Sequence, residues 1–296
     1  MAKPKEERLW TEISVSPQHD RWQMLSNILT EQGVSNRYEP SETTIDNFSE
    51  TLHAATEKCA AIRIGSPFGE SITRHFSHEP ALMMSLGSAD CLVPAHGKWW
   101  TRSALYSAFH HMLREFGDHL NTTQTALIVG AGAAARIAIA SLVKIGFKHI
   151  KITNQFHDQG IDMIAELKKT YFGVRFEFIP VNQLIMLPGT NSIMINTTPY
   201  IPENELVKEL LYFNFLEPGG EVWDMTMTPV ETALVREAEE IGTRVVRGFE
   251  IASWVDVVWA EWAFGHEINR NSYLKSLEKL LRENCPSSTN QSETGP

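Results

Sequence analysis

The sequence predicts an α/β protein made of two domains, and three observations carry this prediction. The chain has 296 residues, which is enough for two ordinary hydrophobic cores. Apolar runs of strand length alternate with runs of helical periodicity through the first 120 residues. From residue 125 to residue 246, strand-like runs are separated by helix-like ones, which is typical of a parallel, doubly wound sheet.

The composition is that of a globular protein, with 43% hydrophobic and 21% charged residues. A net charge of −10 argues against nucleic acid or an anionic membrane as the main partner. No apolar run approaches the roughly 20 residues of a membrane span, and the amino-terminal residues lack the apolar core of a signal peptide. The three cysteines, Cys59, Cys91 and Cys285, are widely spaced, which favours a cytoplasmic location and no disulfide framework.

A metal site is not expected from the histidines. The chain has 11 of them, but only His110 and His111 are adjacent. Neighbouring residues on a helix point about 100° apart, so this pair does not form a ligand face.

The first domain is predicted over residues 1–120, as an α/β domain that binds the substrate. Its strands are expected at Leu9–Val15, at Ala60–Ile64 and around Leu92–Val93, and its helices at Arg21–Gln32, Ile45–Cys59 and Ser103–Phe116. The polar segment 121–125 follows, and we place the domain boundary there.

The second domain is predicted over residues 121–266. Its strands are expected at Thr125–Val129, Ile150–Thr153, Arg175–Ile179, Ser192–Ile195, Glu221–Met225 and Arg244–Val246, and its helices at Ala133–Ile145, Asp158–Tyr171, Pro229–Ile241 and Glu250–His266. A last helix within residues 267–283 is expected to return to the first domain. Residues 284–296 are almost free of apolar side chains, which predicts a disordered tail.

A glycine-rich stretch, Gly130-Ala131-Gly132-Ala133-Ala134-Ala135, follows the first strand of the second domain and opens a helix. It matches the pattern G-x-G-x-x-G/A, with a second strand about 20 residues further on. In this pattern the first glycine permits a tight turn, the second lets the backbone approach a pyrophosphate, and the small third residue keeps the helix close to the sheet. Free N–H groups at the helix start then face the phosphates. The stretch predicts a Rossmann-like domain that binds a dinucleotide.

The identity of the dinucleotide is left open between NADP and NAD. An acidic residue after the second strand is typical of NAD sites, and an arginine nearby accommodates the 2′-phosphate of NADP. Here Asn154 occupies that position, so neither an acid nor an arginine is present. His157 and Lys151 are the nearby residues that could assist a phosphate.

Six further segments occur in an order that covers most of the chain. They are SVSP at 14–17, SPFGE at 66–70, LGSADCL at 86–92, NTTP at 196–199, DMTMTP at 224–229 and GFEI at 248–251. In this order they resemble the motifs of the shikimate dehydrogenase family, over about residues 10–280. The resemblance implies an amino-terminal α/β substrate domain, a Rossmann-like NAD(P)-binding domain with a parallel sheet, and carboxy-terminal helices that pack back on the first domain.

The resemblance also implies roles for individual residues. The hydroxyls of Ser14 and Ser16 would hold the substrate carboxylate. Apart from the resemblance, the positive charge of Arg102 makes it a further candidate ligand of that carboxylate. Thr197, Met225 and Gly248 would lie beside the nicotinamide, in addition to the glycine loop and Asn154.

Several positions depart from the family pattern. The catalytic lysine of the family corresponds to Gly69, its asparagine to Asp90, its tyrosine to Met227 and its glutamine to Val255. The family's catalytic aspartate has no counterpart. Because alcohol oxidation needs a group that takes the hydroxyl proton, we consider Asp90, His96 and Lys98 as replacement catalytic residues.

Two functions are therefore compatible with the sequence. The first is an NAD(P)-dependent oxidoreductase of the shikimate dehydrogenase type, which acts on a cyclic hydroxy acid of the shikimate or quinate class or on a diverged analogue. Such an enzyme belongs to aromatic amino acid biosynthesis. The alternative is a homologue that holds the cofactor but has a regulatory or binding role without turnover. A homodimer is compatible with either.

Overall fold

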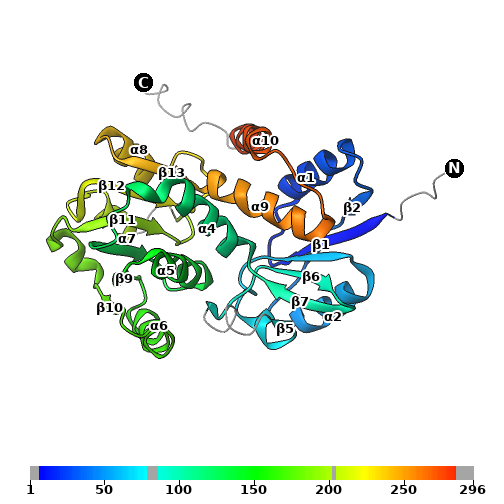
Figure 1. Ribbon diagram of the computed structural model, residues 1–296, viewed down its shortest axis with the longest axis horizontal. Coiled ribbons are helices and arrows are strands. Elements are labelled where there is room, and N and C mark those ends of the chain that lie inside the picture. The colour runs from blue at the N-terminus through cyan, green and yellow to red at the C-terminus, as the bar shows by residue number, and fades with distance from the viewer. Residues whose placement is uncertain (1–6, 79–85, 202–204, 285–296) are drawn as a thin grey trace, which may run out of the picture.

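The computed structural model describes residues 7–78, 86–201 and 205–284. These residues form two lobes, each built around its own sheet, with helices α4 (Ala104–Phe116) and α9 (Gly248–Phe264) running between them (Figure 1). This architecture confirms the predicted two-domain α/β fold.

The first domain contains a mixed sheet with the strand order β2-β1-β4-β6-β7-β5, and β3 pairs with β1. Its strands are β1 (Arg8–Ser14), β2 (Asn36–Tyr38), β3 (Ser41–Glu42), β4 (Ala61–Ile64), β5 (Ser77–His78), β6 (Cys91–Ala95) and β7 (Lys98–Arg102). Its helices are α1 (His19–Glu31), α2 (Phe48–Lys58) and the 3₁₀ turn η1 (Ser71–Arg74). Strands β2, β3 and β4 run parallel to β1, whereas β6 and β7 form an antiparallel hairpin beside β4.

The second domain contains a parallel sheet with the strand order β10-β9-β8-β11-β12-β13. Its strands are β8 (Thr125–Val129), β9 (His149–Thr153), β10 (Arg175–Phe178), β11 (Asn191–Asn196), β12 (Leu216–Asp224) and β13 (Arg244–Arg247). Its helices are α5 (Ala133–Ile145), α6 (His157–Thr170), α7 (Glu205–Leu210) and α8 (Ala233–Glu240), with the 3₁₀ turns η2 (Gly117–His119) and η3 (Val181–Met186). The order reverses between β8 and β11, and ligands of open α/β sheets bind at such switch points.

The helix predicted from Pro229 begins later, at Ala233. The hydroxyl of Thr232 accepts a hydrogen bond of 3.1 Å from the backbone N–H of Val235 and so caps the helix. A hydroxyl at this position satisfies a donor that would otherwise be unpaired, and this effect outweighs the preference for proline in the first turn.

Helix α9 connects the cores of the two domains, because it is apolar on nearly all sides and buried along most of its length. Its indole Trp259 lies 4.7 Å from Trp10 and 6.0 Å from Trp22, measured between ring centroids. The return to the first domain therefore begins within α9, earlier than the predicted residue 267. Helix α10 (Arg270–Asn284) completes the return, and its last residue, Asn284, donates a hydrogen bond to Asp20. The remainder of the predicted tail lies outside the described residues.

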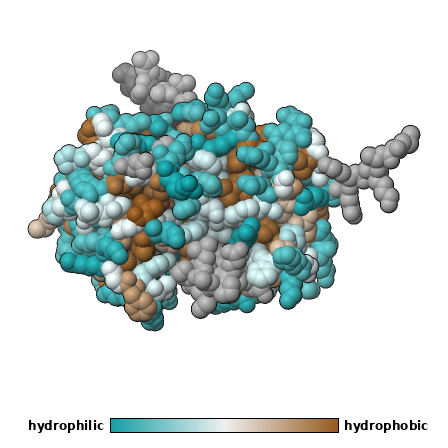
Figure 2. Space-filling model, viewed as in Figure 1, coloured by the Kyte–Doolittle hydropathy of each residue, from teal (hydrophilic) through white to brown (hydrophobic). Residues whose placement is uncertain are grey.

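Hydrophilic residues cover most of the face seen in Figure 1, and hydrophobic residues are scattered among them in small groups (Figure 2). In the described part of the chain, every helix is too short or too polar to cross a bilayer.

The half-buried thiol of Cys59 makes the stability of the fold sensitive to alkaline pH. Burial and then the charge of Glu39 raise the pKa of Cys59 to about 11, from an ordinary value of 9.0. A raised pKa in the folded state stabilises the fold below the unfolded value and loses this contribution as the pH rises. We expect the urea midpoint to fall between pH 9 and pH 11, and to fall less in Cys59→Ser. An equal decrease in both proteins would contradict this assignment.

Candidate active site

The carboxyl ends of β1 and β4 in the first domain lie on the side that faces the carboxyl ends of the parallel strands of the second domain, and we call this region the interdomain edge. A Cβ atom at Gly69, in the loop after β4, would lie 3.5 Å from the Cβ of Ala133 at the start of α5. Beside it, Arg136 Nε lies 3.5 Å from Glu70 Oε1. A second contact between the domains joins Arg21 of α1 to the loop after β12, where Arg21 Nη1 lies 3.3 Å from the sulfur of Met227.

The glycine loop lies at this edge, after β8. Gly130 has φ +111°, and a Cβ atom there would overlap the hydroxyl of Thr197, so only glycine fits this turn. Gly132 is exposed, and a Cβ atom there would meet nothing within 4 Å. Open space therefore lies where the motif places a pyrophosphate.

The start of α5 provides donors for an anion. Among the described residues, no side chain caps this helix at Gly132, so its first N–H groups have no side-chain acceptor from that part of the chain. Ala133 and Ala134 are half-buried at this start, whereas Ala131 and Ala135 are buried and keep the helix close to the sheet. Backbone N–H groups and the helix dipole together favour a phosphate at this position.

The predicted nicotinamide residues lie along the same edge. Thr197 follows β11 and donates its hydroxyl to the carbonyl of Val129 at 2.7 Å. Met225 follows β12, and its N–H donates to the carbonyl of Asn196 at 3.0 Å. A Cβ atom at Gly248 would overlap the carbonyl of Thr226, so glycine lets α9 approach the loop after β12.

A small cavity of about 70 Å³ lies behind these loops, between the ends of β11 and β12 and helices α7 and α8. Asn196 and Asp224 line it and are joined by a hydrogen bond of 3.0 Å. Asp224 also accepts a hydrogen bond of 2.7 Å from Thr232. The carboxylate is 1% exposed and is thus used to hold the loops in place.

Asn154 lies at the end of β9, as predicted, but its amide stabilises the local turn. Its Nδ2 donates hydrogen bonds of 2.9 Å to the carbonyl of Phe156 and to the side chain of Gln159. Lys151 points away from this position, because its ammonium lies 3.4 Å from the hydroxyl of Thr190, before the amino end of β11. The structure therefore removes Lys151 from the candidate ligands of a 2′-phosphate.

Asp90 lies at the interdomain edge and has a well-defined set of partners. One carboxylate oxygen accepts a hydrogen bond of 2.7 Å from the N–H of Ala104, and the other accepts one of 2.7 Å from Leu105. The guanidinium of Arg63 lies 3.3 Å away. Both carboxylate oxygens are thus already occupied by backbone N–H groups, and these contacts favour a positioning role at the start of α4.

His96 and Lys98 lie at the opposite end of the β6–β7 hairpin. His96 occupies the turn between the strands, and both side chains are exposed. The five residues of β6 separate this turn from Asp90, which corresponds to roughly 16 Å. The structure therefore does not bring the three predicted catalytic residues together. The sequence missed this because it did not show that residues 91–102 form a hairpin.

The predicted substrate ligands, Ser14, Ser16 and Arg102, lie at or just after the ends of two strands of the first domain. Ser14 ends β1, and its hydroxyl accepts a hydrogen bond of 3.1 Å from the N–H of Ser16, which is exposed. Arg102 ends β7, where its carbonyl pairs with the N–H of Asp90, and its guanidinium stacks 4.4 Å from the ring of Trp262. These three residues thus share the interdomain edge with Asp90.

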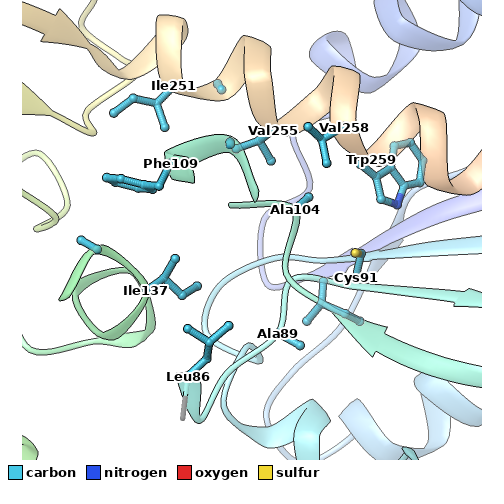
Figure 3. Close-up of a cluster of buried hydrophobic side chains, with 14 of the residues drawn as sticks. Leu86, Ala89, Cys91, Ala104, Phe109, Ile137, Ile251, Val255, Val258 and Trp259 are labelled. Atoms are coloured by element: carbon cyan, nitrogen blue, oxygen red, sulfur yellow. The ribbon is translucent and has the colours of Figure 1, made fainter. Parts of the chain in front are cut away.

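Two departures from the family pattern are filled by packing. A Cβ atom at Gly69 would lie 3.2 Å from the carbonyl of Ala89, so the first atom of any side chain there would be in tight contact with the backbone. Val255 is 5% exposed and belongs to the apolar cluster that joins the two domains (Figure 3). In that view, Val255 projects from α9 toward Phe109 of α4, with Ile251 one turn away.

Sequence reasoning missed a buried network of charges beneath the edge. Arg21 of α1 binds Asp256 of α9 with two hydrogen bonds of 2.8 and 2.5 Å, and Tyr273 donates a third of 2.7 Å to the same carboxylate. Burial opposes the charge of Arg21, but Asp256 outweighs it and raises the pKa of Arg21 above its usual range. Glu12 is also buried, at 6% exposure. An acidic residue inside the apolar run of β1 was the signal for this side chain.

Comparisons with known proteins agree with this arrangement. No protein-family model matches the chain. It is 26% identical over 199 residues to a shikimate dehydrogenase (NADP(+)) of Shouchella clausii, covering 67% of this chain and 69% of that protein. It is 32% identical over 124 residues to the corresponding protein of Geobacter metallireducens, covering 41% of this chain but only 43% of the relative.

Solved structures share the fold along nearly the whole chain. Quinate dehydrogenase of Corynebacterium glutamicum, determined in complex with NAD, superimposes with a TM-score of 0.78 at 16% identity, covering 92% of this chain and 99% of that structure. The chain is thus similar in sequence to shikimate dehydrogenases and shares its two-sheet fold with the solved structures.

Proposed function

We propose that the chain is an NAD(P)-dependent oxidoreductase that transfers a hydride between the nicotinamide and a CH–OH group of a small cyclic substrate. The substrate class is that of shikimate and quinate or a diverged analogue. The observation that carries this proposal is the open, uncapped start of α5 at Gly132. Thr197, Met225 and Gly248 lie along the same edge, where a nicotinamide would extend from a pyrophosphate held at this helix.

The bound cofactor would supply the hydride acceptor, and the residues of the chain would orient it. The N–H groups of Ala133 and Ala134 would hold the pyrophosphate, and the loops at Thr197 and Met225 would flank the ring. The position after β9 offers Asn154 and the exposed His157, whose Nδ1 lies 3.2 Å from a carboxylate oxygen of the exposed Asp158, so both NADP and NAD are compatible with it. The relatives are named for NADP(+), and the Corynebacterium structure holds NAD.

The substrate would lie at the interdomain edge, near Ser14, Ser16, Asp90 and Arg102. We propose that Asp90 positions the start of α4 and the Arg63 side chain, because both of its oxygens are already hydrogen-bonded. His96 and Lys98 remain predicted catalytic residues from the sequence, but their place at the hairpin tip does not favour that role.

A second candidate function is a homologue that holds the cofactor without turnover. The observation that favours it is position 69, where the chain carries a glycine and thus no acid–base side chain, and where a Cβ atom would be in tight contact with the carbonyl of Ala89. Loss of a positioned acid–base group typically lowers the rate by ~10²–10⁴-fold.

One experiment separates the two functions. Each cofactor, NAD or NADP, is mixed with shikimate, with quinate or with the alcohol in which the carboxyl group of shikimate is reduced to hydroxymethyl, and the absorbance of the reduced nicotinamide is followed. Cofactor binding is measured in parallel by calorimetry. Reduction that depends on substrate supports the oxidoreductase, whereas binding without reduction supports the cofactor-holding homologue. A chain that binds neither cofactor would exclude both.

A small-molecule partner and a cytoplasmic location follow from the same proposal, and a net charge of −10 disfavours nucleic acid and anionic membranes as partners. In the part of the chain that the structure describes, Cys59 and Cys91 are free thiols. A homodimer remains a proposal that the sedimentation of the purified chain tests.

A further inference from the structure

Glu12 is a buried carboxylate on β1, an interior strand of the first sheet. Because side chains alternate along a strand, Glu12 shares one face of β1 with Trp10 and Ser14. Only 6% of the residue is exposed, although acidic side chains are rarely buried without a partner. This position near the carboxyl end of β1 requires an explanation.

One oxygen of this carboxylate is occupied and the other is open. Oε2 accepts a hydrogen bond of 2.7 Å from the N–H of Gln18, at the start of α1. Oε1 accepts no hydrogen bond from the described residues. Arg63 lies opposite Glu12 in the strand register, but its guanidinium turns toward Asp90, at 3.3 Å. Glu12 is therefore buried without a direct ion pair to any described residue.

The open oxygen points to the interdomain edge. A Cβ atom at Gly65, just after β4, would lie 2.9 Å from Glu12 Oε1 and 2.5 Å from the Cβ of Ser14. The absence of a side chain at residue 65 thus leaves room for the carboxylate beside Ser14. Gln18 connects the carboxylate of Glu12 to the second domain. Its side-chain oxygen accepts a hydrogen bond from the guanidinium of Arg21, and the same guanidinium contacts the sulfur of Met227.

The charges around Glu12 indicate which group complements it. Burial and then the charge of Glu12 raise the pKa of Tyr38, so the negative field of this carboxylate reaches its neighbours. The guanidinium groups of Arg21 and Arg63 lie on the same side of the sheet, where they disfavour a further cation. A hydroxyl group can donate to Oε1 without adding charge, as ribose hydroxyls do to the acidic residue of NAD sites.

We propose that Glu12 Oε1 and the Ser14 hydroxyl form a binding position for a hydroxyl group of an uncharged polyol, and that this position excludes a carboxylate. The inference rests on the proposed function, because it names the substrate class of the same site. It differs from the role that the family resemblance implies for Ser14, namely holding a substrate carboxylate. A substrate carboxylate beside Ser14 would meet the negative charge of Glu12 in a region with little water to screen it.

The test uses two ligands that differ in one group. They are shikimate and the alcohol in which its carboxyl group is reduced to hydroxymethyl. Calorimetry measures the affinity of each ligand for the wild-type chain, for Glu12→Gln and for Glu31→Gln. Glu31 is the matched control, because it is exposed at the far end of α1 and its replacement makes the same change in net charge.

We expect the wild-type chain to bind the alcohol more tightly than shikimate. Glu12→Gln should increase the affinity for shikimate on the order of tenfold to a hundredfold, because a like charge a few ångströms away is removed. It should also weaken binding of the alcohol, and Glu31→Gln should change neither. The ligand preference of the wild-type chain provides a result even if Glu12→Gln does not fold.

A wild-type preference for shikimate, or an unchanged shikimate affinity in Glu12→Gln, would overturn the inference. Failure of the wild-type chain to bind the alcohol would also overturn it. These results are distinct from failure of the proposed function, which would appear as absence of hydride transfer with NAD and NADP for both ligands. Binding that follows the expected pattern without hydride transfer would retain the polyol site and reject the oxidoreductase.

Discussion

Replacing Gly132 with aspartate should abolish dinucleotide binding while leaving the fold intact. Gly132 is the N-cap of α5, and a Cβ atom there meets nothing within 4 Å, so a side chain fits without strain. Aspartate is among the preferred N-cap residues and interacts favourably with the helix dipole, so the melting temperature should stay the same or rise. The same carboxylate would occupy the pyrophosphate position, where a like charge costs on the order of a hundredfold or more in affinity.

The measurements are calorimetric titration with NAD and with NADP, and thermal unfolding of the cofactor-free chain. Gly132→Asn is the matched control, because asparagine has the same shape and can also cap the helix but carries no charge. We expect its loss of affinity to be much smaller than that of the aspartate variant. If the aspartate variant binds either dinucleotide as tightly as the wild-type chain, the pyrophosphate does not lie at the start of α5.

Replacing Asp256 with asparagine should cause the largest loss of stability. Asp256 is completely buried and accepts hydrogen bonds from Arg21 and Tyr273. Without its charge, the buried guanidinium of Arg21 loses its ionic partner, and breaking a buried pair in this way costs about 3–5 kcal/mol. Urea unfolding of both proteins measures the difference, provided that their m values agree.

Two controls make this prediction specific. Glu283→Gln removes an exposed partner, 3.8 Å from Lys279, and should cost less than about 1 kcal/mol. The double variant Arg21→Met with Asp256→Leu removes both charges, so it should be more stable than Asp256→Asn alone. A loss below about 1 kcal/mol for Asp256→Asn would mean that Gln18 and Glu12 compensate Arg21 without the aspartate.

Local patterns in the sequence were sufficient for the second domain. The run of apolar residues in β8, the glycine loop and the apolar periodicity of α5 all lie within 25 consecutive residues. Their roles depend on backbone conformation and on helix-end chemistry, which are local properties. For the same reason, the predicted cofactor residues are found together at the carboxyl edge of one parallel sheet.

The candidate substrate site depended on contacts that no local pattern contains. Arg21 and Asp256 are 235 residues apart, and the sequence provided no reason to pair them. The antiparallel β6–β7 hairpin determined that His96 lies far from Asp90, although only five residues separate them. Strand pairing of this kind is set by packing across the sheet, which is why the short strands of the first domain were poorly predicted.

The sequence by itself thus determined the two-domain α/β class, the position of the glycine loop and the resemblance to shikimate dehydrogenases, because these follow from periodicity and from motifs whose physics is local. Only the tertiary structure decided which charges meet at the interdomain edge. It placed Glu12 beside Ser14 in the space left by Gly65, and it packed Gly69 against Ala133. Burial and pairing of side chains depend on the whole fold, and they decide what this edge can bind.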